Sequence, residues 1–264
     1  TSIKMMCGIL TPTSGKVLIN GIEPYKKRKL VAKDIGVVFG QKTQLWWDIP
    51  LIETFKILKS IYEVPDDEYN ERFEYLCDLL DMKPFLTQTV RSLSLGQRMR
   101  ADFAAALIHS PKIVYLDEPT IGLDVLVKDK IRSAIKELNK KYNITVILTT
   151  HDMKDIEELC NRIIIIDKGK ILYDGSLTNI KYRFGNTKTV FVPSNIDIDE
   201  IELKNKFEGI SVEKNEDTTA IKFSLNTTDL DDVLIYLINT YHVKDFKIED
   251  ISIEDITKKL YEKH

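Results

Sequence analysis

The 264-residue sequence has the composition of an ordinary globular protein, with 43% hydrophobic and 30% charged residues, enough for one large domain or one plus a smaller one. Its net charge of −3 argues against nucleic acid as the main partner, because phosphate binding needs clustered lysine and arginine. Three widely spaced cysteines argue against a disulfide framework, and no apolar run approaches the ~18 to 20 residues that span a bilayer.

The first forty residues predict a helix followed by turns and two strands. We expect a helix over residues 1–8, closed by a glycine, then a turn at 11–15 and a strand at 16–20. The apolar run Ile35–Phe39 predicts a buried strand, and a polar segment containing Gln41 follows it.

Residues 51 to about 110 predict a helical region. Apolar residues recur at intervals of three and four over 51–62 and again over 69–80, the spacing of a helix face that packs on a core. The segment Leu93-Ser-Leu-Gly-Gln97 precedes a third predicted helix over 98–109.

The strand predicted at Ile113–Leu116 runs directly into two adjacent carboxylates, Asp117 and Glu118. Pro119 and Gly122 then end the strand, so the carboxylates sit at its carboxyl end, where open α/β sheets bind ligands. Adjacent residues on a strand point to opposite sides, so one carboxylate can hold Mg²⁺ while the other faces water. Taken alone, the pair would favour a solvated turn.

A helix is predicted over 125–142, and a buried parallel strand over 144–148 is followed by Thr149-Thr-His151-Asp152. Shorter elements continue to Phe184, where we place the end of the first domain. From residue 185 the pattern restarts with strand-like segments and two helices, which predicts a small α/β appendage. It shows no paired carboxylates, glycine-rich loops or histidine clusters in a spacing typical of a catalytic or metal site, so we assign it a structural or regulatory role.

Five motifs stand in one particular order along the chain, and over residues 1 to about 183 they resemble the nucleotide-binding subunits of ABC (ATP-binding cassette) transporters. The motifs are Gln41, Leu93–Gln97, Asp117-Glu118, Gly122-Leu-Asp124 and Thr149–Asp152. The resemblance implies an α/β fold with a P-loop NTPase-type core over 1–184, a helical subdomain inserted at about 51–110, and a C-terminal accessory domain over 185–264.

The resemblance also implies catalytic roles. Glu118 would act as general base or water positioner, while Gln41 and His151 would sense the γ-phosphate of ATP. Asp117 would hold Mg²⁺ through water, and Gln41 would touch the same ion. Where the family usually has proline before this glutamine the chain has Gly40, so Gln44 competes for the role. We favour Gln41 because it lies directly after the strand.

A second group of residues is implied to bind nucleotide across a dimer. Ser94 and Gly96, with Gln97 beside them, would contact the ATP held by the other subunit, and Asp124 would couple the two sites. The family's first glycine in this signature is replaced by Leu95, which makes the loop stiffer and bulkier. A serine that merely caps the following helix would explain Ser94, but not the residues after it.

The family's phosphate-binding loop, Gly-x-x-x-x-Gly-Lys-[Ser/Thr], does not occur in the sequence, and Gly15-Lys16 is followed by Val17. We expect that the sequence is a fragment or that its start is misassigned, and that the chain as given does not hydrolyse ATP.

The implied cofactors are ATP and Mg²⁺. The implied partners are an integral-membrane permease and a second ATPase subunit, identical or paralogous, on the cytoplasmic face of the membrane. The tail Glu249–Ile256 resembles ATPases of ABC-2-type exporters. A non-catalytic subunit and a soluble ABC protein outside transport remain alternatives. Trp46 and Trp47 either pack into the core or form an exposed patch that docks a partner.

Overall fold

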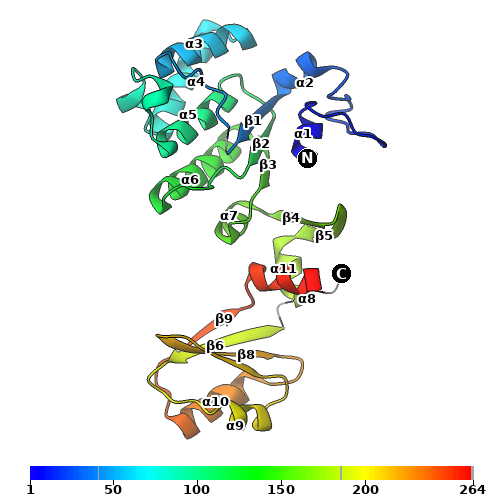
Figure 1. The fold of residues 1–264 in the computed structure, drawn as a ribbon, viewed down its shortest axis with the longest axis vertical. Helices are drawn as coiled ribbons and strands as arrows, with labels where there is room; N and C mark the ends of the chain where they lie inside the picture. The colour runs from blue at the N-terminus through cyan, green and yellow to red at the C-terminus, as the bar shows by residue number, and fades with distance from the viewer. Residues whose placement is uncertain (41, 185, 263–264) are drawn as a thin grey trace. The chain divides into compact units, whose positions relative to one another are not determined.

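The computed structural model describes residues 1–40, 42–184 and 186–262 (Figure 1). It divides into two compact units, Thr1–Leu159 and Cys160–His264. The domain boundary predicted between Phe184 and Gly185 rests on the restart of the sequence pattern at residue 185, and it stays a prediction. No helix in the described part of the chain is long and apolar enough to cross a membrane.

A parallel sheet of three strands lies at the centre of the first unit, in the order β1-β2-β3 (Figure 1). Its register pairs Phe39 with Asp117 and Asp117 with Thr149, so the carboxyl ends of all three strands meet at one edge. The β-branched and aromatic runs of these strands favour a sheet that helices cover. The strands are β1 (Ile35–Phe39), β2 (Ile113–Asp117) and β3 (Thr145–Thr149).

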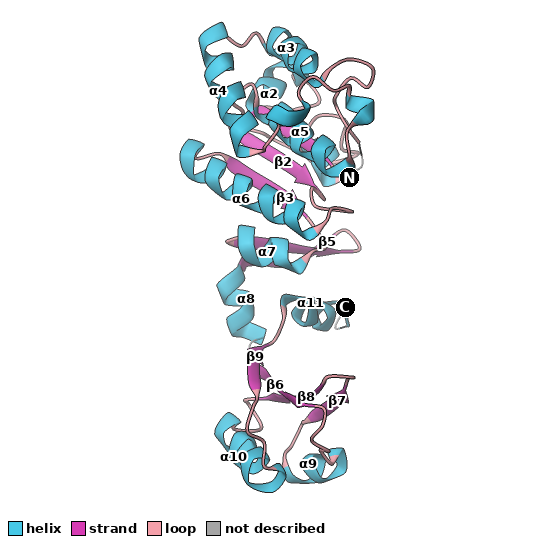
Figure 2. Ribbon diagram, turned by 90° about the vertical axis from the view of Figure 1, so that its left-hand side faces the viewer, coloured by secondary structure: helices cyan, strands magenta, loops and turns pink. Residues whose placement is uncertain are grey.

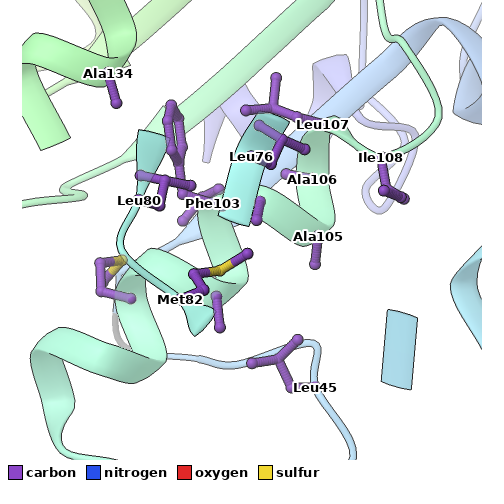
Figure 3. Packing of buried hydrophobic residues seen from close by; sticks show 14 of the residues in the cluster. Leu45, Leu76, Leu80, Met82, Phe103, Ala105, Ala106, Leu107, Ile108 and Ala134 are labelled. Carbon is purple, nitrogen blue, oxygen red and sulfur yellow. The ribbon is translucent and has the colours of Figure 1, made fainter. Parts of the chain in front are cut away.

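Seven α-helices accompany this sheet among the described residues of the first unit. They are α1 (Ser2–Met6), α2 (Arg28–Asp34), α3 (Leu51–Tyr62), α4 (Asp66–Leu79), α5 (Leu95–Leu107), α6 (Val125–Tyr142) and α7 (Met153–Leu159). One buried cluster joins the sheet to the helical region, and Figure 3 shows Leu76 and Phe103 within it. Helix α5 lies very close to β1, since a Cβ at Gly36 would stand 2.2 Å from the carbonyl oxygen of Ala106.

The strand predicted at 16–20 is wrong. Only an isolated bridge between Ile19 and Ile22 forms there, closed by Asn20 and Gly21 in the left-handed region. A tight turn of this kind supplies no neighbouring strand to complete a ladder, so the β-branched residues stay in irregular structure. Helix α2 was not predicted.

The second unit begins with an antiparallel hairpin of β4 and β5, followed by a four-stranded antiparallel sheet in the order β7-β8-β6-β9 (Figure 2). The chain order β-α-β-β-α-β with this strand order is that of a ferredoxin-like fold. Its elements are β4 (Arg162–Asp167), β5 (Lys170–Ser176), α8 (Leu177–Phe184), β6 (Thr187–Pro193), α9 (Glu200–Lys206), β7 (Ser211–Lys214), β8 (Thr218–Ser224), α10 (Leu230–Tyr241), β9 (Lys247–Asp250) and α11 (Ile253–Glu262). Helix α9 was not predicted. A separate cluster of buried side chains packs against this sheet, and Val190, Ile221 and Leu237 belong to it.

Candidate active site

Asp117 lies at the carboxyl edge of the parallel sheet and accepts hydrogen bonds from the ends of both neighbouring strands. The Thr149 hydroxyl, at the end of β3, donates a 2.6 Å hydrogen bond to Oδ1 of Asp117. On the other side, the backbone N–H of Gly40 donates to the carbonyl oxygen of Asp117 at 2.8 Å. Gly40, directly after β1, therefore fixes the backbone of Asp117, and Thr149, the last residue of β3, fixes its side chain.

Glu118 leaves the strand through a left-handed backbone, with a φ of +53°. Such a conformation is uncommon for a residue with a side chain and is found where surrounding structure enforces it. Here the N–H of Glu118 donates to the carbonyl oxygen of Thr149 at 2.9 Å. The expectation that the two carboxylates diverge through the pleat of a strand is therefore wrong, because the backbone turn separates them.

The glycine before Gln41 has a structural cause. A Cβ at Gly40 would stand 2.2 Å from the carbonyl oxygen of Glu118, a distance that no side chain tolerates. The turn at Glu118 thus requires glycine where the family usually has proline. Gln41 itself lies outside the described residues, so its predicted role is untested.

His151 lies beside Glu118, with its Nδ1 atom 3.4 Å from Oε1 of the carboxylate. Both side chains are open to solvent, and 72% of the histidine side chain is exposed. The structure thus brings together Asp117, Glu118 and His151 at one accessible edge, as the motif order predicted. A water molecule and a phosphate group can reach such a site.

Asp155, a buried carboxylate outside the predicted motifs, connects the segments of this edge through hydrogen bonds. Asp155 is fully buried, and its Oδ2 accepts hydrogen bonds from the hydroxyls of Thr120 at 2.6 Å and Thr150 at 3.0 Å. Its Oδ1 accepts from Nε of Arg132 at 2.6 Å, and this arginine is only 2% exposed. Asp155 therefore fastens helix α6 to the two segments that carry the candidate catalytic residues.

Ser94 caps helix α5 through a capping box. The N–H of Gln97 donates to Oγ of Ser94 at 3.2 Å, and the N–H of Ser94 donates to Oε1 of Gln97 at 2.9 Å. The helix therefore begins at Leu95, and the predicted start at residue 98 is wrong. The Ser94 hydroxyl proton stays available as a donor, at a helix amino terminus that favours anions.

The signature segment lies against the residues that follow the carboxylates. A Cβ at Gly96 would stand 3.0 Å from Cγ2 of Val127, and one at Gly122 would stand 3.5 Å from Cδ2 of Leu95. Asp124 caps α6, since its Oδ1 accepts from the N–H of Val127 at 2.9 Å. Leu95, which replaces a family glycine, thus has its side chain close to Gly122 of the same chain.

The segment after Gln41 is attached to helix α5. The N–H of Gln44 donates to Oδ1 of Asp102 at 2.9 Å, and its side-chain amide donates to the carbonyl oxygen of Asp102 at 3.1 Å. Gln44 is therefore engaged away from the sheet edge, which favours Gln41 for the sensor role. Trp46 and Trp47 are 40% and 44% exposed, so the interpretation that they pack into the core is wrong.

Burial raises the pKa of the Asp102 carboxyl to about 6, although hydrogen bonds from Gln44 and Thr43 and the charge of Arg98 act to lower it. A carboxyl with a raised folded-state pKa contributes stability that is complete below its ordinary pKa of 3.8 and is lost as the pH rises through about 6.

We therefore expect acidification from about pH 7 to pH 5 to stabilise the unmodified protein relative to Asp102→Asn by about 1 kcal/mol. Asparagine does not titrate, so the difference between the two proteins isolates this carboxyl. Urea unfolding of both proteins at the two pH values measures it. A difference that stays constant, or that moves toward the variant on acidification, would contradict the assignment.

The carboxylate oxygens at this edge suit Mg²⁺ in the way that proteins usually bind this ion next to a nucleotide. Mg²⁺ keeps several waters and takes one or two carboxylates plus substrate phosphates, without a dedicated protein cage. Asp117 supplies one carboxylate, and Glu118 follows it. Among the described residues there is no group of three or more His, Cys, Asp or Glu that would hold a metal without the nucleotide.

Comparison with known proteins agrees with this arrangement. The ABC transporter family profile matches residues 1–121. Over 180 residues the chain is 30% identical to the ABC transporter ATP-binding protein NatA of Bacillus subtilis. The aligned residues make up 68% of this chain and 73% of NatA. Over 184 residues it is 32% identical to the methionine import ATP-binding protein MetN 2 of Enterococcus faecalis. The aligned residues make up 68% of this chain and 53% of MetN 2.

Among solved structures, a dimeric ATP-binding cassette in a post-hydrolysis state with ADP and Pi is 26% identical, with a TM-score of 0.59. That match covers 67% of this chain and 79% of the cassette. The predicted fold class is therefore confirmed. By its fold, its ordered motifs and these similarities, the chain belongs to the ABC transporter family, among the ATP-binding subunits that are its ATPases.

Proposed function

We propose that this protein supplies the ATP hydrolysis that drives a separate membrane permease, and that the permease is an exporter of the ABC-2 type. The placement of Asp117, Glu118 and His151 at one solvent-open edge carries the hydrolytic part of the proposal. The export direction rests only on the resemblance of the tail and of the segment after Gln41 to exporter ATPases. MetN 2 is named for import, so the family alone leaves the direction open.

In the proposed site Glu118 accepts a proton from, or orients, the attacking water, and the His151 ring contacts the γ-phosphate. Asp117 would hold Mg²⁺, with Gln41 as a further proposed ligand, and the bound ion would neutralise phosphate charge. Phosphoryl transfer depends on positioning and charge more than on covalent catalysis, which suits polar residues fixed by neighbouring strands.

A second ATPase subunit, identical or paralogous, completes each site in this proposal. Ser94, Gly96 and Gln97 reach the nucleotide of the partner, and Asp124 couples the two sites. Support comes from three exposed apolar residues at these segments, Leu95, Val125 and Leu126, of which Leu126 is 82% exposed. An exposed apolar group beside polar motifs is typical of an interaction surface.

We further propose that the protein lies on the cytoplasmic face of the membrane and docks the permease through Trp46 and Trp47. Ile57 and Ile61 are also exposed on helix α3 of the same unit. Residues 1–184 would form the ATPase domain, with 185–264 as an accessory or regulatory domain that has its own buried cluster.

The docking role makes a prediction. Trp46→Ala is expected to weaken binding of the protein to membranes containing its permease by about tenfold or more, because exposed tryptophans at interfaces commonly contribute ~2 kcal/mol. Cosedimentation with permease vesicles measures the loss. Tyr182→Ala, which removes another exposed aromatic ring, serves as the control. Equal binding by both variants would place the docking surface elsewhere.

ATP turnover by the full gene product tests the proposed function. We expect Mg²⁺-dependent hydrolysis that rises when permease vesicles are added, and substrate movement out of the cytoplasmic compartment. Nucleotide binding without hydrolysis would favour the non-catalytic alternative. Hydrolysis that no permease stimulates would favour an ABC protein outside transport.

A further inference from the structure

The segment 42–48, called here the docking loop, is fastened to the signature helix α5 by two contacts one helical turn apart. The guanidinium of Arg98 lies over the ring of Trp47, 4.7 Å from its centroid. Asp102, four residues later on the same helix face, accepts hydrogen bonds from the Thr43 hydroxyl at 3.0 Å and the N–H of Gln44 at 2.9 Å.

Asp102 is only 5% exposed, so its carboxylate depends on these donors. A buried charge is costly unless it is hydrogen-bonded, and the docking loop supplies the hydrogen bonds. Thr43 is fixed in turn, because its Oγ1 accepts from the N–H of Leu45 at 3.1 Å and Leu45 is buried. The loop cannot leave α5 without exposing or stranding the Asp102 carboxylate.

The end of the docking loop is attached to the residues just before the signature. The N–H of Arg91 donates to the carbonyl oxygen of Trp47 at 3.0 Å, and the side chain of Arg91 pairs with Asp48. Arg98 also donates to the carbonyl oxygen of Leu93 at 3.3 Å. The docking loop therefore contacts both the helix α5 and the turn that leads into Ser94.

We propose that Asp102 is a positioning residue that makes the docking loop and the signature helix move as one piece, so that a membrane partner pressing on Trp46 displaces Ser94. The proposal rests on the proposed function and deepens it, because it assigns the route by which the partner regulates ATP turnover. Asp102 touches neither nucleotide nor water in this role. It acts through helix α5, whose first turn Ser94 caps.

Four variants of the full protein test this role. Asp102→Ala removes the acceptor, and Asp102→Asn keeps an oxygen acceptor but removes the charge. Thr43→Val removes one donor. Thr54→Val is the control, because it makes the same substitution at a buried threonine whose hydroxyl has no hydrogen-bond partner.

The readout is the ratio of permease-stimulated to basal ATP turnover. We expect Asp102→Ala to lower this ratio about tenfold, since a hydrogen bond to a charged group contributes on that scale, with basal turnover retained. Thr43→Val should lower the ratio less, Asp102→Asn should recover part of it, and Thr54→Val should leave it unchanged. A purely structural role would lower basal and stimulated turnover together, and that result would overturn the proposal.

Hydrogen exchange at the backbone amides of Gln44 and Leu45 gives a second readout that needs no ATP hydrolysis. Both amides should exchange faster in Asp102→Ala and in Thr43→Val than in Thr54→Val. Unchanged exchange in both variants would overturn the proposal even if the stimulation ratio falls. If the unmodified protein does not hydrolyse ATP, the proposed function fails separately, and the exchange result alone decides whether Asp102 holds the loop.

Discussion

Glu118→Gln is expected to lower ATP turnover by about 10²- to 10⁴-fold while leaving ATP binding intact, and to trap the ATP-bound dimer. Glutamine has the size of glutamate and keeps an oxygen near His151, but its amide cannot accept a proton from water. The variant therefore tests whether Glu118 acts in the chemical step rather than in folding. Steady-state turnover and light scattering of the dimer at saturating ATP measure the two parts of this prediction.

The left-handed backbone at Glu118 needs its own control, since a substitution there can disturb the turn. Glu63 provides it, because this glutamate also has a left-handed backbone, with a φ of +56°, and lies on the surface with Lys33 as its partner. Glu63→Gln should keep normal turnover. Turnover of Glu118→Gln within about tenfold of the unmodified protein would refute the general-base role, as that factor is below the usual contribution of such a group.

The sheet edge was predictable because strand and motif follow each other directly in the sequence. Ile113–Leu116 is an apolar run that ends at carboxylates, and the same pattern precedes His151. Parallel strands that pair without an offset bring their carboxyl ends to the same edge of the sheet. The pairing of Asp117 with Thr149 shows this. Local pattern and sheet geometry were therefore sufficient to place Asp117, Glu118 and His151 at one edge.

Local pattern was not sufficient where a long-range contact decides the structure. The turn at Glu118 depends on the close approach of its carbonyl oxygen to Gly40, 78 residues earlier. The start of α5, by contrast, rests on a local capping box between Ser94 and Gln97. Asp155 is one of four acidic residues in 152–158, and nothing in the sequence separates it from its exposed neighbours. Asp102 stands in a helix whose apolar face the sequence does show, but its partners lie 58 and 59 residues earlier.

The second large effect is expected on stability, at the buried ion pair between Arg132 and Asp155. Arg132→Met should lower the free energy of unfolding of the first unit by about 3–5 kcal/mol, because it leaves the Asp155 carboxylate buried without its cation. Methionine retains much of the apolar stem of the arginine side chain, so the change acts mainly by removing the guanidinium and its hydrogen bonds. Urea unfolding followed by circular dichroism measures the change.

An exposed ion pair of the same unit supplies the control for this effect. Arg91 pairs with Asp48 at the surface, where the two side chains are 70% and 74% exposed. Arg91→Met should therefore cost less than about 1 kcal/mol. If Arg132→Met costs no more than Arg91→Met, Asp155 is not the buried anchor that its contacts indicate.

The double variant Arg132→Met with Asp155→Leu separates stability from positioning. Removing both charges avoids a stranded carboxylate, and such replacements are often neutral or stabilising by about 1–4 kcal/mol. The hydroxyls of Thr120 and Thr150 would still lose their common acceptor. We therefore expect the double variant to recover most of its stability but not its ATP turnover. Recovery of both would mean that the ion pair serves folding alone, and that Glu118 and His151 keep their places without it.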